Sequence, residues 1–187
     1  MFGVLGTVFA GYIGLLLVMY VGQRHLMYHP GPIEGTPTTL GVPDMEALTL
    51  TKRSGNTITS WYKPPNAKQL ILIYFHGNAG SITDRIEKVR PYLNAGFGVL
   101  LAGYRGYGGN SGSPSESGLY EDANTVLAHL QISDIPPHRW VLYGESLGTG
   151  IATEMAHRYA RQNTPVASLI LEAPFTSMGD AAAEHYP

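Results

Sequence analysis

Apolar residues come in short runs and in longer periodic segments along this chain, and each kind predicts a different element. Short continuous runs are typical of strands buried on both faces. The runs that fit this description are Leu70–Phe75, Gly98–Ala102, Trp140–Tyr143 and Ala167–Leu171. Longer segments with apolar residues at helical spacing lie between these runs. The expected helices are Asp84–Ala95, Ser115–Gln131 and Ser146–Arg161.

Two strand candidates precede this alternation. Glu46–Thr51 and Thr57–Lys63 flank Ser54-Gly55-Asn56, a turn typical of a hairpin. Repeated strand and helix segments predict an α/β fold, a mostly parallel sheet with helices on both faces. Functional sites in such sheets lie at the carboxyl ends of the strands, so the loops after the buried strands are the places to look for chemistry.

The first segment predicts a membrane helix. Phe2–Gly22 contains no charged residue, Asn, Gln or His, and its 21 residues would span about 31 Å, the thickness of a bilayer core. A cleaved signal peptide is the competing interpretation. It is disfavoured because no Lys or Arg precedes the run, the run is long, and no A-x-A site follows. Arg24 on the C-terminal flank favours a cytoplasmic hydrophilic part.

The next segment is rich in proline and glycine. Residues 26–43 contain four prolines and three glycines, which predicts a linker without regular structure. We therefore expect a transmembrane anchor at residues 1–22, a linker at 23–45 and the α/β domain at 46–187.

Composition narrows the function classes. The chain has 187 residues, 12 Lys and Arg against 14 Asp and Glu, and no cysteine. A net charge of −2 argues against a nucleic-acid binder. The absence of cysteine excludes disulfides, thiolate metal sites and a cysteine nucleophile. No cluster of metal ligands is visible in the sequence, and we expect neither a metal nor an organic cofactor.

The most specific motif follows the third buried run. Gly144-Glu145-Ser146-Leu147-Gly148 is a G-x-S-x-G sequence between a predicted strand and a predicted helix, the context of a nucleophile elbow. The sharp turn strains its central residue and leaves room only for very small residues two positions away on either side. Ser146 is therefore the candidate nucleophile, at a helix N-terminus that favours developing negative charge. Glu145 is not expected to be the catalytic acid.

A second motif, His76-Gly77-Asn78-Ala79-Gly80, follows the first buried run directly. Acyl transfer needs two N–H donors aimed at the developing oxyanion. We expect these donors to be the backbone N–H groups of Leu147 and Asn78. Gly77 would let the backbone approach the substrate, and His76 is expected to order the loop rather than to act as the base.

A third loop, from Gly103 to Pro114, is rich in glycine. A phosphate-binding loop is disfavoured because no GK[ST] follows and the G-x-G-x-x-G spacing fails. We expect this loop to shape the floor of the active site, with Arg105 as a structural tie.

Together these motifs resemble the α/β-hydrolase superfamily, and in particular its membrane-anchored serine hydrolases, the group with bud-emergence-type proteins and lysophospholipid and palmitoyl-thioester hydrolases. The matching stretches are QRHLMYHP at 23–30, YFHGNAGS at 74–81, YRGYGGNSGSPSE at 104–116, YGESLGTGIA at 143–152 and LEAPFTSM at 171–178. The resemblance implies Ser146 as nucleophile, Asn78 and Leu147 as oxyanion donors, and a partial α/β-hydrolase fold.

The chain departs from the family after the elbow. In this fold the acid and then the base histidine follow the nucleophile, and the resemblance predicts that the sequence stops before both. Within the sequence, Glu172 and Asp180 are the alternative acids and His185 is the alternative base. A sequence that lacks the later strands would leave Ala167–Leu171 as an uncovered apolar edge strand, which is typical of a protein prone to aggregation.

Two function classes remain. The first is a membrane-anchored serine hydrolase that cleaves an ester, thioester or amide of a small-molecule or lipid acyl substrate through an acyl-enzyme on Ser146. The second is a catalytically inactive hydrolase fragment or a non-catalytic membrane interaction protein. Labelling of Ser146 by a fluorophosphonate would discriminate between the two classes.

Overall fold

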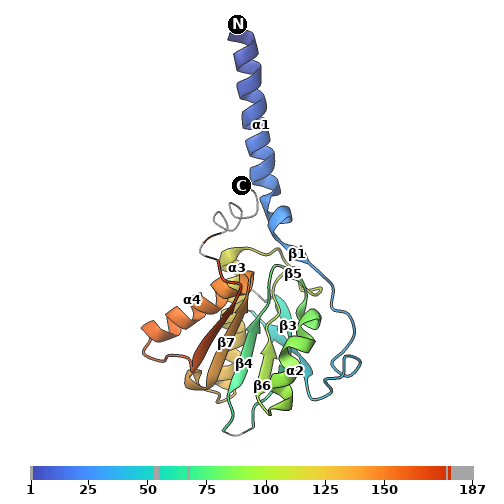
Figure 1. Ribbon diagram of the computed structural model, residues 1–187, viewed down its shortest axis with the longest axis vertical. Coiled ribbons are helices and arrows are strands. Elements are labelled where there is room, and N and C mark those ends of the chain that lie inside the picture. The colour runs from blue at the N-terminus through green and yellow to red at the C-terminus, as the bar shows by residue number, and fades with distance from the viewer. Residues whose placement is uncertain (1, 53–54, 67, 176, 178–187) are drawn as a thin grey trace.

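A long N-terminal helix stands clear of an α/β domain in the computed structural model, which describes residues 2–52, 55–66, 68–175 and 177 (Figure 1). The elements in chain order are α1 (Phe2–Met27), β1 (His29–Pro30), β2 (Glu46–Thr51), β3 (Thr57–Lys63), β4 (Ile71–Phe75), β5 (Ala79–Gly80), the 3₁₀ turn η1 (Ile82–Arg85), α2 (Ile86–Asn94), β6 (Gly98–Leu101), α3 (Glu116–Ile132), the 3₁₀ turn η2 (Pro137–Arg139), β7 (Trp140–Glu145), α4 (Leu147–Arg161) and β8 (Ser168–Glu172).

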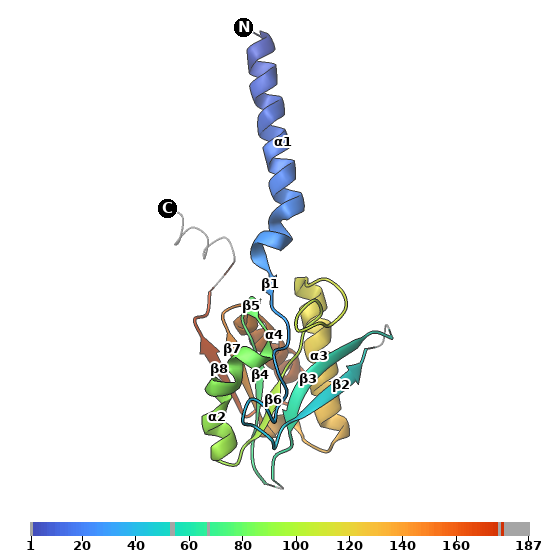
Figure 2. The same ribbon diagram turned by 90° about the vertical axis from the view of Figure 1, so that its right-hand side faces the viewer.

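The main sheet has the strand order β2-β3-β6-β4-β7-β8. The strands β6, β4, β7 and β8 run parallel to one another, whereas β2 and β3 form an antiparallel hairpin that continues the sheet on one side. Figure 2 shows this hairpin reaching beyond the rest of the domain. The predicted α/β class and the mostly parallel sheet are confirmed.

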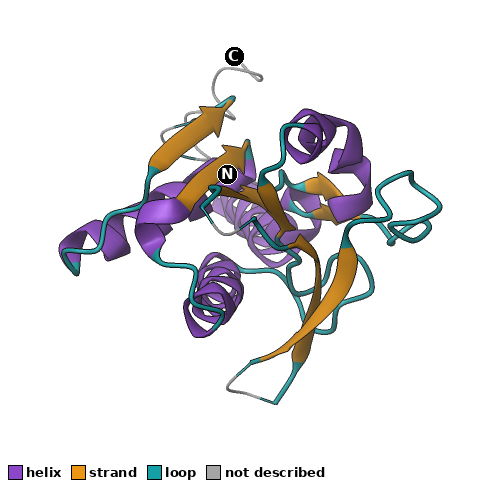
Figure 3. Cartoon of the chain, turned by 90° about the horizontal axis from the view of Figure 1, so that it is seen from below, coloured by secondary structure: helices purple, strands orange, loops and turns teal. Residues whose placement is uncertain are grey.

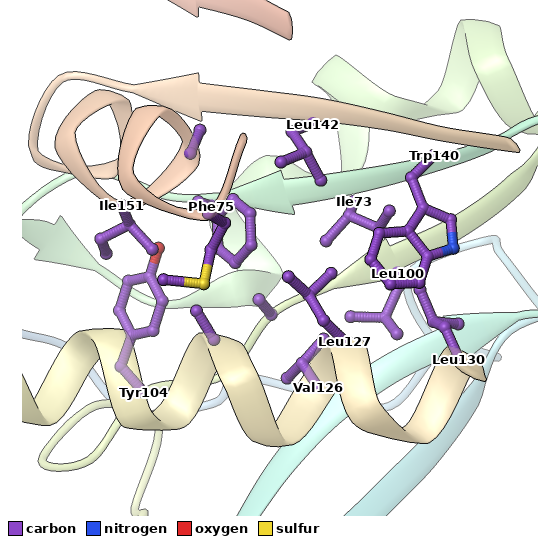
Figure 4. Packing of buried hydrophobic residues seen from close by; sticks show 14 of the residues in the cluster. Ile73, Phe75, Leu100, Tyr104, Val126, Leu127, Leu130, Trp140, Leu142 and Ile151 are labelled. Carbon is purple, nitrogen blue, oxygen red and sulfur yellow. The ribbon is translucent and has the colours of Figure 1, made fainter. Parts of the chain in front are cut away.

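The central strand β4 is buried on both faces because its side chains alternate between two cores. Ile73 and Phe75 pack with residues of α3 and α4 on one face, and Leu72 and Tyr74 pack with residues of α2 on the other. Figure 3 shows helices on both sides of the sheet, and Figure 4 shows the core between the sheet and α3. The layers therefore hold the carboxyl end of β4 in a fixed place.

The helix expected at Asp84–Ala95 begins two residues earlier, as the turn η1, and continues as α2. Ser81 caps the turn: its hydroxyl accepts a hydrogen bond from the N–H of Thr83, and the Asp84 carboxylate accepts one from the N–H of Ser81. The cap thus sets where the loop after β4 ends.

The last strand is not buried on both faces as its apolar run predicted. Leu169 and Leu171 in β8 are 37% and 39% exposed. β8 is the outermost strand of the sheet on its side, so among the described residues only β7 pairs with it. The exposure follows from this position at the edge, which agrees with the alternative expectation of an uncovered edge strand.

The N-terminal helix is longer than expected and ends at Met27 instead of Gly22. Gly3–Gln23 is long and apolar enough to cross a membrane, and none of that stretch is buried against the rest of the protein. The expectation that residues 26–43 hold no regular structure is wrong at Leu26 and Met27, which belong to α1, and at His29 and Pro30, which form β1 and pair with β5. The segment then packs Val42 into the core beside α2.

Candidate active site

Ser146 lies at the sharp turn between β7 and α4, with φ of 48° and ψ of −114°. A side chain in this region of positive φ strains the backbone, and such strain persists only where surrounding contacts enforce it. The N–H of Ser146 donates to the Glu172 carbonyl at 2.9 Å, and its own carbonyl accepts from the N–H and hydroxyl of Thr149. Ser146 is partly exposed, and its side chain does not cap α4.

The two glycines of the motif lie where no side chain fits. A Cβ on Gly144 would lie 2.5 Å from the Gly148 carbonyl oxygen. A Cβ on Gly148 would collide with the carbonyl oxygen of Phe75, the last residue of β4. The start of α4 therefore packs directly on β7 and on the end of β4. This packing places Ser146 at the carboxyl ends of the strands, where the loop after β4 begins.

That loop lies against Ser146. A Cβ on Gly77 would be 3.5 Å from the Cβ of Ser146, an ordinary packing distance. Gly77 is therefore the backbone neighbour of the predicted nucleophile.

His76 holds the peptide unit between Gly77 and Asn78. Its Nδ1 lies 2.8 Å from the Gly77 carbonyl oxygen, and because that oxygen only accepts, Nδ1 carries the proton. The C=O and N–H of one planar peptide point in opposite directions, so this bond also orients the N–H of Asn78. The ring is buried against Tyr104 and Tyr107. Burial lowers the pKa of His76 to about 4, which keeps the imidazole neutral.

Both the side chain and the backbone carbonyl of Asn78 make hydrogen bonds that hold this residue in place. Its side-chain amide donates to the Met27 carbonyl at the end of α1 at 2.8 Å. Its carbonyl accepts from the N–H of His29 at 2.9 Å and from the hydroxyl of Tyr107 at 2.9 Å. These partners come from the predicted linker and from the glycine-rich loop, so three separate segments meet at this residue.

Leu147 provides the N–H that begins α4. The first N–H groups of a helix have no partner inside the helix and carry its positive end. Leu147 directly follows Ser146 in the chain, and Asn78 directly follows Gly77, the glycine that lies against Ser146.

The carboxylate of Glu145 is used by a structural network. Arg85 donates to it through Nε at 2.9 Å and Nη2 at 3.2 Å, and the Tyr74 hydroxyl donates to it at 2.8 Å. Burial alone would raise the pKa of Glu145, but the hydrogen bonds from Arg85 and Tyr74 outweigh it and hold the pKa below its usual value. The network ties the elbow to η1.

Glu172, one of the predicted alternative acids, is engaged in the same way. Lys88 donates to its carboxylate at 2.7 Å and the Tyr143 hydroxyl donates to it at 2.7 Å. These bonds lower the pKa of Glu172. Among the described residues, the structure brings no histidine to Glu172. Asp180 and His185 lie outside the described residues.

The glycine-rich loop between β6 and α3 packs beneath the site. Tyr104 and Tyr107 are fully buried against His76. Arg105 binds Asp122 with its backbone N–H and its guanidinium, at 2.7 to 3.0 Å, which confirms it as a structural tie. Within the part of the chain that the structure describes, no group of three or more His, Cys, Asp or Glu side chains could hold a metal ion.

Sequence analysis missed the residues that connect the motifs. Arg85, Tyr107 and the carbonyl of Met27 each contact a motif residue from a distant part of the chain. Met27 and Tyr107 lie within the matched stretches at 23–30 and 104–116, but nothing in those stretches indicates their contacts, and Arg85 lies outside every motif. The one sequence signal for Arg85 is its position, a basic residue five positions after the HGNAG motif. Basic residues near a motif are too common for this position to predict a contact.

The mostly parallel sheet and the turn between β7 and α4 define an α/β-hydrolase type of architecture, and comparison with known proteins identifies the family. A family model described as "alpha/beta hydrolase fold" matches residues 71–185. The chain belongs to the α/β-hydrolase fold family.

Among curated relatives, an uncharacterized protein of Mycobacterium tuberculosis is 35% identical over 179 residues, which are 93% of this chain and 61% of that protein. The lysophosphatidylserine lipase ABHD12 of Mus musculus is 38% identical over 130 residues, 67% of this chain and 32% of the lipase. The chain thus spans less than two thirds of the length of these relatives.

Solved structures agree on the fold. An α/β hydrolase from Vibrio vulnificus aligns with a TM-score of 0.69 at 24% identity, over 85% of this chain and 66% of that chain. The Pyrococcus furiosus esterase Pf2001 aligns with a TM-score of 0.61 at 20% identity, over 86% of this chain and 61% of the esterase.

Proposed function

We propose that this protein is a serine hydrolase of the esterase and lipase type, with Ser146 as its nucleophile. The observation that carries the proposal is the strained backbone of Ser146, with φ of 48°. The proposed oxyanion donors are the backbone N–H of Leu147, the next residue, and the backbone N–H of Asn78 in the loop after β4. Strain of this kind clusters at functional sites, where it forms part of the mechanism. His76, Gly77, Gly144 and Gly148 act as supporting residues that hold the two loops together.

The proposed reaction is acyl transfer to water. Ser146 Oγ adds to the carbonyl carbon of the substrate, and its proton passes to a base. The N–H groups of Asn78 and Leu147 stabilise the oxyanion. The bond from the carbonyl carbon to the leaving group breaks, and the leaving group takes the proton from the base. Water then attacks the acyl-enzyme, which releases the carboxylic acid and restores the Ser146 hydroxyl. Esters, thioesters and amides follow the same steps.

The proposed base is a histidine imidazole oriented by a carboxylate. His76 does not fit this role, since its Nδ1 is bonded to Gly77 and its burial disfavours protonation. Glu172 fits the role of the catalytic acid poorly, because its carboxylate already accepts hydrogen bonds from Lys88 and Tyr143. His185 as the base and Asp180 as an acid stay predictions, because both lie outside the described residues.

The proposed substrate class is a lipid with an acyl chain. The named relatives with more than 30% identity include lysophosphatidylserine lipases. An acyl ester is the functional group that a serine nucleophile and two oxyanion donors are suited to attack.

We also propose that α1 is retained as a membrane anchor, with the division into anchor 1–22, linker 23–45 and domain 46–187 predicted above. Gly3–Gln23 has the length and composition for a span. The hydrogen bond from Asn78 to the Met27 carbonyl supports retention, because cleavage of a signal peptide near this place would remove the helix that Asn78 caps. The alkaline-carbonate extractability of the protein, and the mass of its N-terminal peptide, test the anchor against the signal peptide.

The decisive experiment for the activity compares the protein with Ser146→Ala. A fluorophosphonate probe should label the first and not the second, and p-nitrophenyl acetate should be hydrolysed only by the first. An unlabelled protein without ester turnover would favour the non-catalytic membrane interaction protein instead.

A further inference from the structure

A hollow of about 610 Å³ lies where the end of α1 meets the starts of α3 and α4. Its volume is within the range of small-molecule binding sites, which are roughly 300–1,000 Å³. Figure 1 shows α1 rising from this side of the domain, beside β1 and β5. The hollow is therefore located at the junction between the proposed membrane helix and the catalytic domain.

The wall formed by α4 begins one residue after the proposed nucleophile. Leu147, Gly150 and Ile151 line the hollow, and Leu147 also carries the proposed oxyanion donor. Gly150 has nothing within 4 Å of the position of a Cβ, so the hollow is open above it. A molecule whose carbonyl lies at Ser146 would thus have this space directly beside it.

The lining favours a hydrocarbon chain over a charged headgroup. Met27, Leu119 and Phe175 add apolar surface from three different segments. Glu116 is the one charged side chain among the described lining residues, and its negative charge would repel a phosphate or a carboxylate. A hydrocarbon chain gains from the apolar walls. Glu116 is exposed and accepts a hydrogen bond from the Tyr120 hydroxyl, so its charge can stay in contact with water while the chain is bound.

The opening leads towards apolar surface. Gln23 and Met27 line the hollow from the last turns of α1, and the apolar stretch Gly3–Gln23 continues directly from there. An acyl chain that leaves a bilayer along α1 would follow this apolar stretch as far as Gln23, at the rim of the hollow.

We propose that this hollow is the binding site for the acyl chain of the ester that reacts at Ser146, and that the protein therefore prefers esters of medium or long chains. The inference rests on the proposed function. To the proposed function this inference adds where the acyl chain of the substrate binds, the direction in which that chain points, towards α1, and the residues that limit the length of the chain.

The test fills the hollow from two opposite walls. Gly150→Leu introduces a side chain from α4, and Gln23→Trp introduces one from α1. Thr153→Leu is the matched control, because Thr153 is an exposed residue of the same helix and does not line the hollow. The full-length proteins in detergent micelles are assayed with p-nitrophenyl acetate and p-nitrophenyl octanoate, and their thermal melting is recorded.

We expect the unmodified protein to show a kcat/KM for the octanoate at least about tenfold above that for the acetate. We expect each filling variant to lower this ratio by about tenfold, the effect of losing a few methylene contacts in a pocket. Thr153→Leu should keep both the ratio and the acetate activity. If one filling variant fails to melt cooperatively, the other, on a different helix, decides the matter.

The outcomes are distinct. Equal kcat/KM for the two esters in the unmodified protein, or an unchanged ratio in the filling variants, would overturn the acyl site while leaving Ser146 as nucleophile, and would mean that parts of the protein itself fill the hollow. No turnover of either ester and no fluorophosphonate labelling would overturn the proposed function and this inference together.

Discussion

The side-chain amide of Asn78 donates a hydrogen bond of 2.8 Å to the carbonyl oxygen of Met27. Met27 is the last residue of α1, and its carbonyl is one of those that a helix C-terminus leaves without a partner inside the helix. The residue that carries a proposed oxyanion donor thus also caps the proposed membrane anchor. The end of α1 and the loop after β4 are thus joined directly by this hydrogen bond.

Loss of this hydrogen bond should affect turnover more than substrate affinity. In Asn78→Ala the backbone N–H remains, but the loop loses a bond worth about 1 kcal/mol. We expect kcat for p-nitrophenyl acetate to fall about fivefold with little change in KM. Asn78→Asp should be worse, since a carboxylate would face the Met27 carbonyl. Asn94→Ala, at an exposed residue of α2, is the control. A change in KM alone would argue against a role in orienting the oxyanion donor.

The strain at Ser146 predicts that Ser146→Gly stabilises the protein while abolishing activity. Glycine adopts positive φ without steric cost, and a residue held in a strained region costs roughly 1–3 kcal/mol. We expect a higher melting temperature for Ser146→Gly than for Ser146→Ala, which removes the hydroxyl but keeps the Cβ. Equal melting temperatures of the two variants would show that the elbow stores no strain.

Two glycines of α4 should respond oppositely to the same substitution. A Cβ at Gly148 would collide with the Phe75 carbonyl, whereas a Cβ at Gly150 meets nothing within 4 Å. Gly148→Ala should destabilise the protein by about 3 kcal/mol or prevent folding. Gly150→Ala should stabilise it by about 0.5–1 kcal/mol, because alanine is the better helix former. Chemical denaturation of both variants checks the pair, and an equal response would contradict the packing at the start of α4.

The ion pair between Arg85 and Glu145 should stabilise the elbow. Both side chains are largely shielded, 11% and 17% exposed, so each of Arg85→Gln and Glu145→Gln should cost about 2 kcal/mol, between the values for surface and buried pairs. The double variant should cost less than the two single variants combined. Glu87→Gln, which removes only the exposed partner of the surface pair Glu87–Arg90, is the control and should show little effect. Additive costs at Arg85 and Glu145 would mean that the two side chains act independently.

The buried His76 predicts a loss of stability in mild acid. Burial lowers its pKa from 6.5 to about 4, so as the pH falls below 6.5 the unfolded chain takes up a proton that the folded protein does not. Stability therefore falls until the pH drops below the folded-state pKa. Between about pH 8 and pH 5 this one group should cost about 2 kcal/mol.

His76→Asn isolates this effect. Asparagine retains a donor that can reach the Gly77 carbonyl but does not titrate, so the variant should lose less stability over the same pH range than the unmodified protein. Denaturant unfolding at several pH values measures the difference. Parallel pH profiles of the two proteins would show that folding leaves the pKa of His76 unchanged.

The elements that sequence analysis predicted best are those specified by local pattern. β2 and β3 begin and end at the expected residues, since alternation and a glycine turn act over a few positions. The helix start at η1 was misplaced because its cap, Ser81, belongs to the loop and not to the apolar pattern. The apolar run of β8 resembles that of β4, yet Leu171 is exposed, because burial depends on neighbours in space and β8 pairs with β7 alone among the described strands.

By itself, the sequence determined the order of the main strands and helices, the α/β class and the elbow around Ser146, because apolar periodicity and the G-x-S-x-G spacing are properties of neighbouring residues. The short pair β1 and β5 was not predicted. Only the tertiary structure decided that Met27, Tyr107 and Arg85 fix the two loops at the site. These contacts join residues far apart in the chain, and their energy depends on a geometry that exists only once the sheet has brought the loops together.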